Sequence, residues 1–428
     1  MMNKIDTQDL RIGMYVCELD RPWRETPFLF QGFEIRTEEE LKTLQQYCRT
    51  VYITTSESHT PSRNAPASRP VPPKPPLSAD PAKLRASLLY QDMLKINNHP
   101  GGRSVYADET TLEEEVSLVK ETFAEASAMV QEIMWQAKFG KSLDVPGMRK
   151  VVGNMIKSVL RNPDALTCFT QLKKKDEYTA QHSLRSSILA LVFGRQLGLS
   201  QEELELLGLG ALLCDIGKMK IPSEVLNRPA PLAPDEIGVI RMHVPWGVEI
   251  LEKTNQIPYA AIEIARRHHE RFDGSGYLEK LSGDAIGQFG MIAGIVDHYD
   301  AVTSDRPFRA GVTAHTALKK MYEWRGTLFQ PGLVEKFIQC MGIYPIGSVV
   351  ELNTGEIGVV AALNRMQRLK PRVALALRAD KTPYLEMPVV NLVGRTTPQG
   401  RPCEIERVLE PDVCDIDPTP YLPLPIAI

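Results

Sequence analysis

Eight prolines fall within the 21 residues 61–81, and they constrain the fold of this 428-residue chain more than any other stretch. Proline has no backbone N–H donor and a fixed φ angle, so neither a helix nor a central strand tolerates this density. We therefore predict an extended, semi-stiff linker at 57–82. The linker separates a small N-terminal domain, 1–56, from the larger part of the chain that follows.

The N-terminal domain carries signals for both helix and strand. Thr37 is followed three residues later by Glu40, which is the spacing of a capping box and predicts a helix over 37–48. The β-branched and aromatic run at 51–54 predicts a strand, and a second strand is expected after a turn at Gly13. A small mixed α/β domain follows from this pattern.

Helical periodicity dominates from about residue 108 to about 340. Leu112, Val116 and Val119 begin an apolar stripe that runs along one face of a long amphipathic helix. We predict that this stripe packs within the chain, with a homodimer seam as the alternative. Asp144 and Pro146 are typical of the start of the next helix. We therefore assign a helical connector to 83–143 and a helical domain to 144–342.

The pattern changes after residue 343 to short apolar alternations typical of strands. Apolar residues alternate on both sides of Asn353, Thr354 and Gly355, which predicts a β-hairpin. The last 25 or so residues are rich in proline and acidic residues, and we expect them to wrap around the domain or fray. The prediction for 343–428 is a β-rich appendage with a tail.

Charge and composition exclude several classes of protein. The formal net charge of −3 gives no global basic field for a long nucleic acid. The sequence contains no run of roughly 18 apolar residues, so it predicts no membrane span. The N-terminus lacks an apolar signal core. The seven cysteines are scattered without a CxxC pair, which favours a reducing compartment. We expect a cytoplasmic protein.

Five of the eight histidines lie between residues 182 and 298, inside the predicted helical domain. Several of these histidines, and two aspartates, interrupt apolar helix faces where an unpaired polar group would be costly. Helices packed as a bundle can bring such residues to one internal cavity. Imidazole and carboxylate donors together suit Fe, Mn, Zn, Ni or Co, and one carboxylate can bridge two ions. The candidate ligands are His182, Asp215, His243, His268, His269 and Asp297.

An ordered set of motifs resembles one known family. The motifs are YTAQHS, LGALLCDIGK, MHVPWGVEIL, HHERFDGSGY and DHYDAVTSDRPFR. They resemble HD-GYP domains, which are bacterial hydrolases of cyclic di-GMP, over about residues 175–340. The stretch LRIGMYVCELDRPW resembles the small domain of unknown function often found ahead of HD-GYP domains. The resemblance implies a mostly α fold: an HD-type helical bundle, a small mixed α/β N-terminal domain and a β-rich C-terminal appendage.

The resemblance also implies roles for individual residues. The six candidate ligands fall on metal-ligand positions. Lys218 falls on the lysine that meets the scissile phosphate, and Arg306 and Arg309 fall on arginines that hold the dinucleotide. Tyr277 begins the GYP loop, which reads GYL here, and this loop is the expected contact for substrate or for a diguanylate cyclase domain. Tyr178 stands where members with three metals carry an acidic ligand, so we expect two divalent ions, with Fe, Mn and Zn not distinguished.

The implied reaction is hydrolysis of cyclic di-GMP to pGpG, and further hydrolysis to GMP stays open. Two ions clamp the phosphate and activate a water as hydroxide, with Asp215 and Lys218 as the catalytic residues. Two alternatives stay open as well. One is a regulator that binds cyclic di-GMP or a protein but has lost catalysis. The other is an HD-type phosphohydrolase that acts on another nucleotide.

Cys214 is the main departure from the family pattern, because the family carries the histidine of its H-D pair at this position. Three interpretations are open. Cys214 can be a thiolate ligand, which favours a softer ion such as Zn or Fe. It can be a redox-sensitive thiol that inactivates the site when it is oxidised. It can also be a small buried residue that has lost the ligand role.

Overall fold

The computed structural model describes residues 2–21, 26, 28, 33–54, 105–172, 178–228, 230–305, 310–410 and 416–423. The chain divides into two compact units, Met1–Lys95 and Ile96–Ile428, and each is described by itself. The linker predicted at 57–82 lies outside the described residues. The connector predicted at 83–143 is described from residue 105 onward.

Unit 1 contains a four-stranded antiparallel sheet with the strand order β1-β4-β2-β3. The capping box predicted at Thr37 and Glu40 is present, and it begins the helix α1. Leu44 of this helix is fully buried and joins Val16 and Val51 of the sheet in the core of the unit. The elements are β1 (Met2–Asp6), β2 (Tyr15–Leu19), β3 (Phe33–Glu34), α1 (Glu38–Tyr47) and β4 (Thr50–Thr54).

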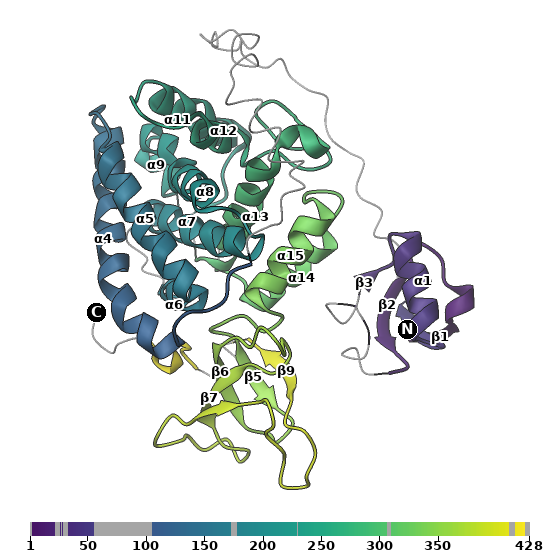
Figure 1. Ribbon diagram of the computed structural model, residues 1–428. Helices are drawn as coiled ribbons and strands as arrows, with labels where there is room; N and C mark the ends of the chain where they lie inside the picture. The colour runs from purple at the N-terminus through teal and green to yellow at the C-terminus, as the bar shows by residue number, and fades with distance from the viewer. Residues whose placement is uncertain are drawn as a thin grey trace. The chain divides into compact units, whose positions relative to one another are not determined.

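Unit 2 is mainly helical, which confirms the predicted fold class (Figure 1). None of the helices in the described part of the chain combines the length and apolar character needed to cross a bilayer. The helices are α4 (Leu112–Lys138), α5 (Val145–Arg161), α6 (Pro163–Phe169), α7 (Tyr178–Gln196), α8 (Gln201–Leu213), α9 (Ser223–Leu226), α10 (Pro234–Arg241), α11 (His243–Glu252), α12 (Tyr259–Arg267), α13 (Gln288–Thr303), α14 (Ala314–Glu323) and α15 (Pro331–Met341).

The long helix α4 packs its apolar stripe within the chain, as predicted. Leu112, Val116 and Val119 are buried, and the helix lies along α5, α6 and α7 (Figure 1). Arg161 of α5 pairs through two nitrogens with the buried carboxylate of Glu115, at 2.7 Å each. The predicted homodimer therefore does not use this stripe, and it stays a prediction.

Helix α8 lies between α7 and α12, and two glycines allow the close approach. A Cβ atom on Gly208 would collide with the side chain of Leu191 in α7, and one on Gly210 would collide with Ile264 in α12. Both neighbours are fully or almost fully buried apolar residues with little room to move. This packing brings the end of α8 next to the end of α12.

The appendage is a five-stranded antiparallel sheet with the order β8-β7-β6-β5-β9. The hairpin predicted around Gly355, which has a φ of 80°, joins β5 to β6. The buried side chains of Val350, Val360 and Val373 give the sheet a core of its own. The strands are β5 (Val349–Leu352), β6 (Ile357–Ala362), β7 (Arg372–Leu377), β8 (Val389–Asn391) and β9 (Ile405–Leu409).

Strand β9 corrects one expectation from the sequence. The last 25 or so residues were expected to wrap or fray, but Ile405–Leu409 pairs with β5 inside the sheet. Only Ile405 and Leu409 of this strand are buried, while Glu406 and Arg407 face solvent. The charged residues between two apolar ones hid the strand from a search for alternating patterns.

Ion pairs join the appendage to the helices of unit 2. Arg365, between β6 and β7, binds Asp164 at the start of α6 and also lies 3.4 Å from Asp108. Arg372 of β7 pairs with Glu113 of α4 at 2.6 Å. These ion pairs attach the sheet to the helices at specific positions.

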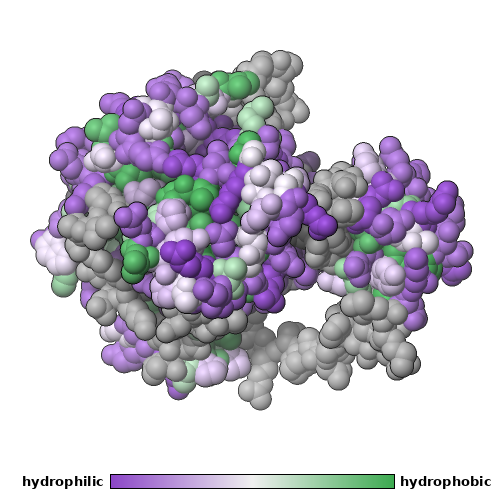
Figure 2. Space-filling model, turned by 90° about the horizontal axis from the view of Figure 1, so that it is seen from below, coloured by the Kyte–Doolittle hydropathy of each residue, from purple (hydrophilic) through white to green (hydrophobic). Residues whose placement is uncertain are grey.

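The face of the molecule seen in Figure 2 is mostly hydrophilic, with smaller apolar areas between the hydrophilic ones.

Candidate metal centre

The structure brings the six predicted ligands together from separate elements of unit 2. They form two groups that share one carboxylate. Within each group, one candidate ligand atom per residue lies within 4.8 Å of the others. The four-residue group consists of Asp215, His243, His268 and His269, and the three-residue group consists of His182, Asp215 and Asp297.

The imidazoles of the four-residue group are oriented by backbone carbonyls of their own chain segments. His243, the first residue of α11, lies with its Nδ1 2.7 Å from the carbonyl oxygen of Ile240. His268, directly after α12, has its Nδ1 2.8 Å from the carbonyl oxygen of Ala265. A carbonyl only accepts, so each Nδ1 must carry the proton and each Nε2 must carry a lone pair. Both histidines therefore present nitrogens that are able to ligate a metal ion.

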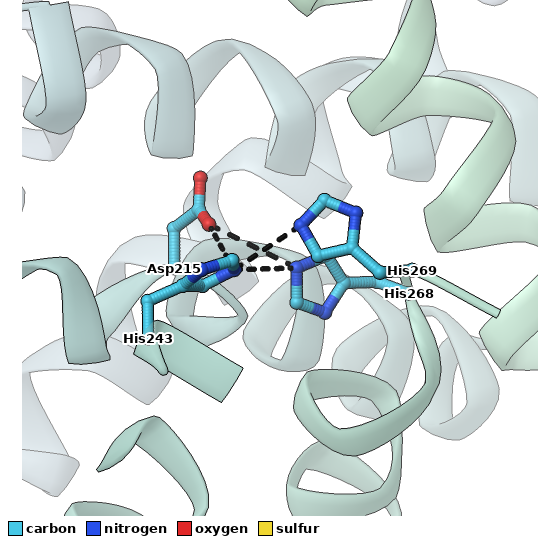
Figure 3. Close-up of side chains that lie close together, drawn as sticks. All are labelled: Asp215, His243, His268 and His269. Carbon is cyan, nitrogen blue, oxygen red and sulfur yellow. Dashed lines mark hydrogen bonds and ion pairs between the residues drawn. The ribbon is translucent and has the colours of Figure 1, made fainter. Parts of the chain in front are cut away.

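These lone pairs face one another across a short distance (Figure 3). The Nε2 atoms of His243 and His268 are 3.4 Å apart, and Nε2 of His269 is 3.1 Å from Nε2 of His243. Burial lowers the pKa of His243 to about 4 against the opposing effect of Asp215, so its ring is neutral near pH 7. Facing lone pairs repel one another unless a cation lies among them.

The carboxylate of Asp215 adds a negative charge beside these imidazoles. Its Oδ1 atom is buried and has no hydrogen-bond partner among the described residues, and it lies 3.3 Å from Nε2 of His243. Burial alone would raise the pKa of Asp215, but the Lys218 ammonium and the neighbouring imidazoles hold it well below its usual range. An orphaned anionic oxygen facing imidazole lone pairs is a donor set that fits a divalent cation.

The three-residue group is built on His182 of α7. Its Nε2 lies 3.0 Å from Oδ1 of Asp297 in α13 and 3.2 Å from Oδ2 of Asp215. Its Nδ1 lies 2.6 Å from Oδ2 of Asp300, which also receives two hydrogen bonds from Arg185. A carboxylate behind a ligating histidine fixes the tautomer and orients the ring.

Arg185 and Asp300 were not predicted as site residues, although the sequence carried a signal for them. Arg185 follows His182 by three residues, and Asp300 follows Asp297 by three, so each pair shares one face of its helix. Both side chains are almost completely buried. Recognising their pairing required knowing that α7 packs against α13.

Cys214 lies outside both groups. Its thiol is buried and donates to the carbonyl oxygen of Ala211, one turn back, at 3.3 Å. Burial, reinforced by the charge of Asp215, raises the pKa of this thiol well above its usual value. A thiol that lies outside both groups and donates to Ala211 favours the interpretation of a small buried residue over that of a thiolate ligand.

The remaining predicted site residues divide between described and undescribed parts of the chain. Lys218, in the 3-10 helix Ile216–Lys220, forms an ion pair with Asp215, and 13% of its side chain is exposed. Tyr277 stacks on the ring of His269, with 4.8 Å between centroids. Arg306 and Arg309 lie outside the described residues.

The loop that carries Tyr277 is held from inside by Glu270, a residue that the sequence did not single out. The Glu270 carboxylate, 4% exposed, accepts hydrogen bonds from the backbone N–H groups of residues 279, 280 and 281 at 2.7–3.1 Å. Gly276 packs so closely on the backbone of Glu270 and Arg271 that a Cβ atom would not fit. The loop is therefore tied directly to the segment that carries His268 and His269.

Comparison with known proteins gives matches in both units. A model described as a domain of unknown function (DUF3391) matches residues 2–147, and a model described as HD domain matches residues 167–333. A cyclic di-GMP phosphodiesterase of Pseudomonas aeruginosa is 31% identical over 96% of this chain and 92% of its own length. The match therefore includes the N-terminal unit and the appendage as well as the helices between.

Two further relatives match a smaller part of the chain. A cyclic di-GMP phosphodiesterase response regulator of Xanthomonas campestris is 38% identical over 39% of this chain and 45% of its own. A 3'3'-cGAMP-specific phosphodiesterase of Vibrio cholerae is 31% identical over 39% of this chain and 32% of its own. The chain thus spans less than half of these two relatives.

Proposed function

This chain belongs to the HD-GYP family of metal-dependent phosphodiesterases and is an enzyme, and we propose that it hydrolyses cyclic di-GMP to linear pGpG. The relative that matches nearly the whole chain is named a cyclic di-GMP phosphodiesterase. The more identical of the two relatives that match about two fifths of the chain carries the same activity in its name. Both support cyclic di-GMP over the cGAMP named for the Vibrio cholerae relative.

The observation that carries this proposal is the shared carboxylate of Asp215. Its orphaned Oδ1 faces the four-residue group, and its Oδ2 faces His182 in the three-residue group. Two divalent ions held in this way would activate a water and offset charge on a phosphoryl oxygen. The nitrogen and oxygen donors are compatible with Fe, Mn and Zn alike.

The protein's own residues position these donors and balance charge. Asp300, itself paired with Arg185, holds the ring of His182 so that its Nε2 points at both carboxylates. Lys218 lies beside Asp215 with part of its side chain open to solvent. Its ammonium can offset negative charge that grows on the phosphoryl oxygens during hydrolysis.

A regulator that binds cyclic di-GMP without cleaving it is the second candidate function, and Cys214 favours it. The thiol lies in neither group, so the three-residue group has only His182, Asp215 and Asp297. Loss of one ligand or of its outer-shell support can cost about 10 to 100-fold in metal affinity or activity. Such a loss slows an enzyme without abolishing turnover, so we place hydrolysis first.

The test is turnover by the purified full-length protein loaded with Mn²⁺ or Fe²⁺. Cyclic di-GMP and 3'3'-cGAMP are offered separately, and the linear products and GMP are resolved by chromatography. We expect pGpG from cyclic di-GMP, and we expect the Asp297→Asn variant to form it about 10 to 100-fold more slowly. Tight binding of cyclic di-GMP without product would favour the regulator over the phosphodiesterase. Cleavage of cGAMP alone would correct the substrate.

Two predictions about partners remain. One is the contact between a diguanylate cyclase domain and the loop at 276–278, and the other is a homodimer. Leu278 of this loop is exposed, with 37% of its surface open to solvent. A cytoplasmic location also stays a prediction.

A further inference from the structure

Arg241 differs from the other basic residues between positions 218 and 267. Every other lysine or arginine between residues 218 and 267 forms an ion pair with a carboxylate: Lys218 with Asp215, Lys220 and Lys253 with Glu249, Arg228 with Glu236, Arg266 with Glu252 and Glu263, and Arg267 with Glu263. Arg241 is exposed, and no carboxylate in the described part of the chain lies within ion-pair distance of it. Its positive charge is therefore available to a ligand.

The position of Arg241 connects it to the metal centre. It is the last residue of α10 and precedes His243 by two positions. Its guanidinium lies over the ring of Tyr277, 5.0 Å from the centroid, and that ring stacks on His269. A cation held over an aromatic face keeps its N–H donors free for other partners. The stacked groups thus connect an imidazole of the four-residue group to the exposed guanidinium of Arg241.

The support beneath Arg241 is rigid. The backbone N–H of Tyr277 donates to the carbonyl oxygen of His269 at 3.3 Å. Three backbone hydrogen bonds to the buried Glu270 carboxylate hold the next residues of the loop. These hydrogen bonds tie the ring beneath the guanidinium to the segment that carries His269. A fixed positive group at a fixed distance can select substrates by the spacing of their anionic groups.

The proposed substrate class has this property. A cyclic dinucleotide contains two phosphodiesters in one ring, and only one of them can lie at the metal centre during cleavage. The other stays anionic and needs a donor at the far side of the ring. We propose that Arg241, supported by Tyr277, binds the phosphodiester that is not cleaved. This assignment rests on the proposed function, and it makes Arg241 a residue that distinguishes cyclic dinucleotides from simple diesters.

The experiment compares Arg241→Met with Arg241→Lys in the metal-loaded full-length protein. The Met variant keeps an apolar stem on Tyr277 but removes the charge, whereas the Lys variant keeps the charge. We expect the Met variant to raise KM for cyclic di-GMP about tenfold with kcat unchanged, in line with the loss of one charge-assisted hydrogen bond. We expect the Lys variant to recover most of this loss.

Two controls separate binding of the second phosphate from general damage. Bis(p-nitrophenyl) phosphate has a single phosphodiester, so its kcat and KM should be the same in the Met variant and the wild type. Lys253→Met removes the same charge from the exposed end of α11, where the lysine pairs with Glu249, and should leave KM for cyclic di-GMP unchanged.

The outcomes that overturn the assignment are distinct from those that overturn the proposed function. A wild-type enzyme that cleaves bis(p-nitrophenyl) phosphate but not cyclic di-GMP removes the proposed function and the assignment together. Wild-type hydrolysis of cyclic di-GMP with an unchanged KM in Arg241→Met overturns the assignment alone. An equal rise in KM for both substrates also overturns it, because the arginine would then act through the loop and not through the second phosphate.

Discussion

The two halves of the metal centre are held in different ways. In the four-residue group, His243 and His268 are each oriented by a backbone carbonyl three residues earlier in the chain. In the three-residue group, His182 is oriented by the side chain of Asp300 on another helix, and this carboxylate depends in turn on Arg185. Local helix geometry therefore secures one half, whereas tertiary packing of α7 on α13 secures the other.

The two halves also differ in the number of donors. Three imidazoles and a carboxylate form one group, but one imidazole and two carboxylates form the other, with the thiol of Cys214 turned toward Ala211. We expect the first ion to bind more tightly than the second. The predictions below test this asymmetry.

The largest effect is expected from Asp215→Asn, since this residue belongs to both groups. The amide is neutral and its NH₂ group is no ligand, so one ion loses a donor and both ions lose the balancing charge. We expect the rate of hydrolysis to fall by more than about 100-fold and the bound metal to fall in elemental analysis. A variant that retains two ions and a near-normal rate would show that Asp215 is not shared.

Cys214→His sharpens the comparison by adding a fourth donor to the weaker half. We expect the second ion to bind about 10 to 100-fold more tightly, with a faster rate at limiting metal. Metal titration followed by elemental analysis measures this, and Cys214→Ser is the matched control. The Ser variant should behave like the wild type, because the thiol only donates to a carbonyl. A large loss in the Ser variant would instead identify the thiol as a ligand.

Asp300→Asn is expected to weaken only the three-residue group. The variant leaves the buried Arg185 without a full counter-charge and releases the ring of His182. We expect affinity for the second ion to fall about tenfold, while the first ion stays bound. The exposed acid Asp284 supplies the control, since Asp284→Asn should change neither. Equal loss of both ions would mean that the two halves are not independent.

The last prediction concerns the pH dependence of stability in the metal-free protein. Burial lowers the pKa of His243 from 6.5 to about 4 despite the neighbouring Asp215. Between these values the unfolded chain binds a proton that the folded chain does not bind. The free energy of unfolding should therefore decrease as the pH falls through this range, by up to about 1.4 kcal/mol per pH unit from this histidine.

Urea unfolding at pH 6.5 and at pH 4.5 measures this slope, and His243→Gln should make it shallower. Burial alone would raise the pKa of the Asp297 carboxylate, but His182 and His269 outweigh this effect and hold the pKa well below its usual range. Its contribution is lost only in stronger acid, below about pH 4. The four-residue group should thus respond to mild acid before the aspartate of the other group does. An unchanged slope in His243→Gln would remove this distinction.

Much of the fold could be predicted because its signals are local. The capping box at Thr37 and Glu40 marked α1, and Asp144 with Pro146 marked the start of α5. The turn at Gly355 marked the β5–β6 hairpin. Each signal lies within four consecutive residues, so no knowledge of tertiary packing was needed. Strand β9 escaped because its charged residues interrupt the apolar alternation, and its partner β5 lies 53 to 60 residues earlier in the chain.

The residues of the candidate site also divide into those that local signals predicted and those that depend on tertiary packing. Histidines and aspartates on apolar helix faces pointed to a common cavity, and the structure brings the six candidates together. The pairing of Arg185 with Asp300 depends on how α7 meets α13, which no local pattern reveals. The unpaired charge of Arg241 is recognised only after the partners of its neighbours are known.

The ion pair between Arg365 and Asp164 has a practical consequence for anyone who shortens this protein. A boundary drawn at residue 342, after the last helix, would remove Arg365 and with it the cation that pairs with Asp164. The same cut would remove Arg372, which pairs with Glu113 of α4. We expect the shortened protein to be less stable than the intact one, so an inactive fragment would not by itself exclude activity in the intact enzyme.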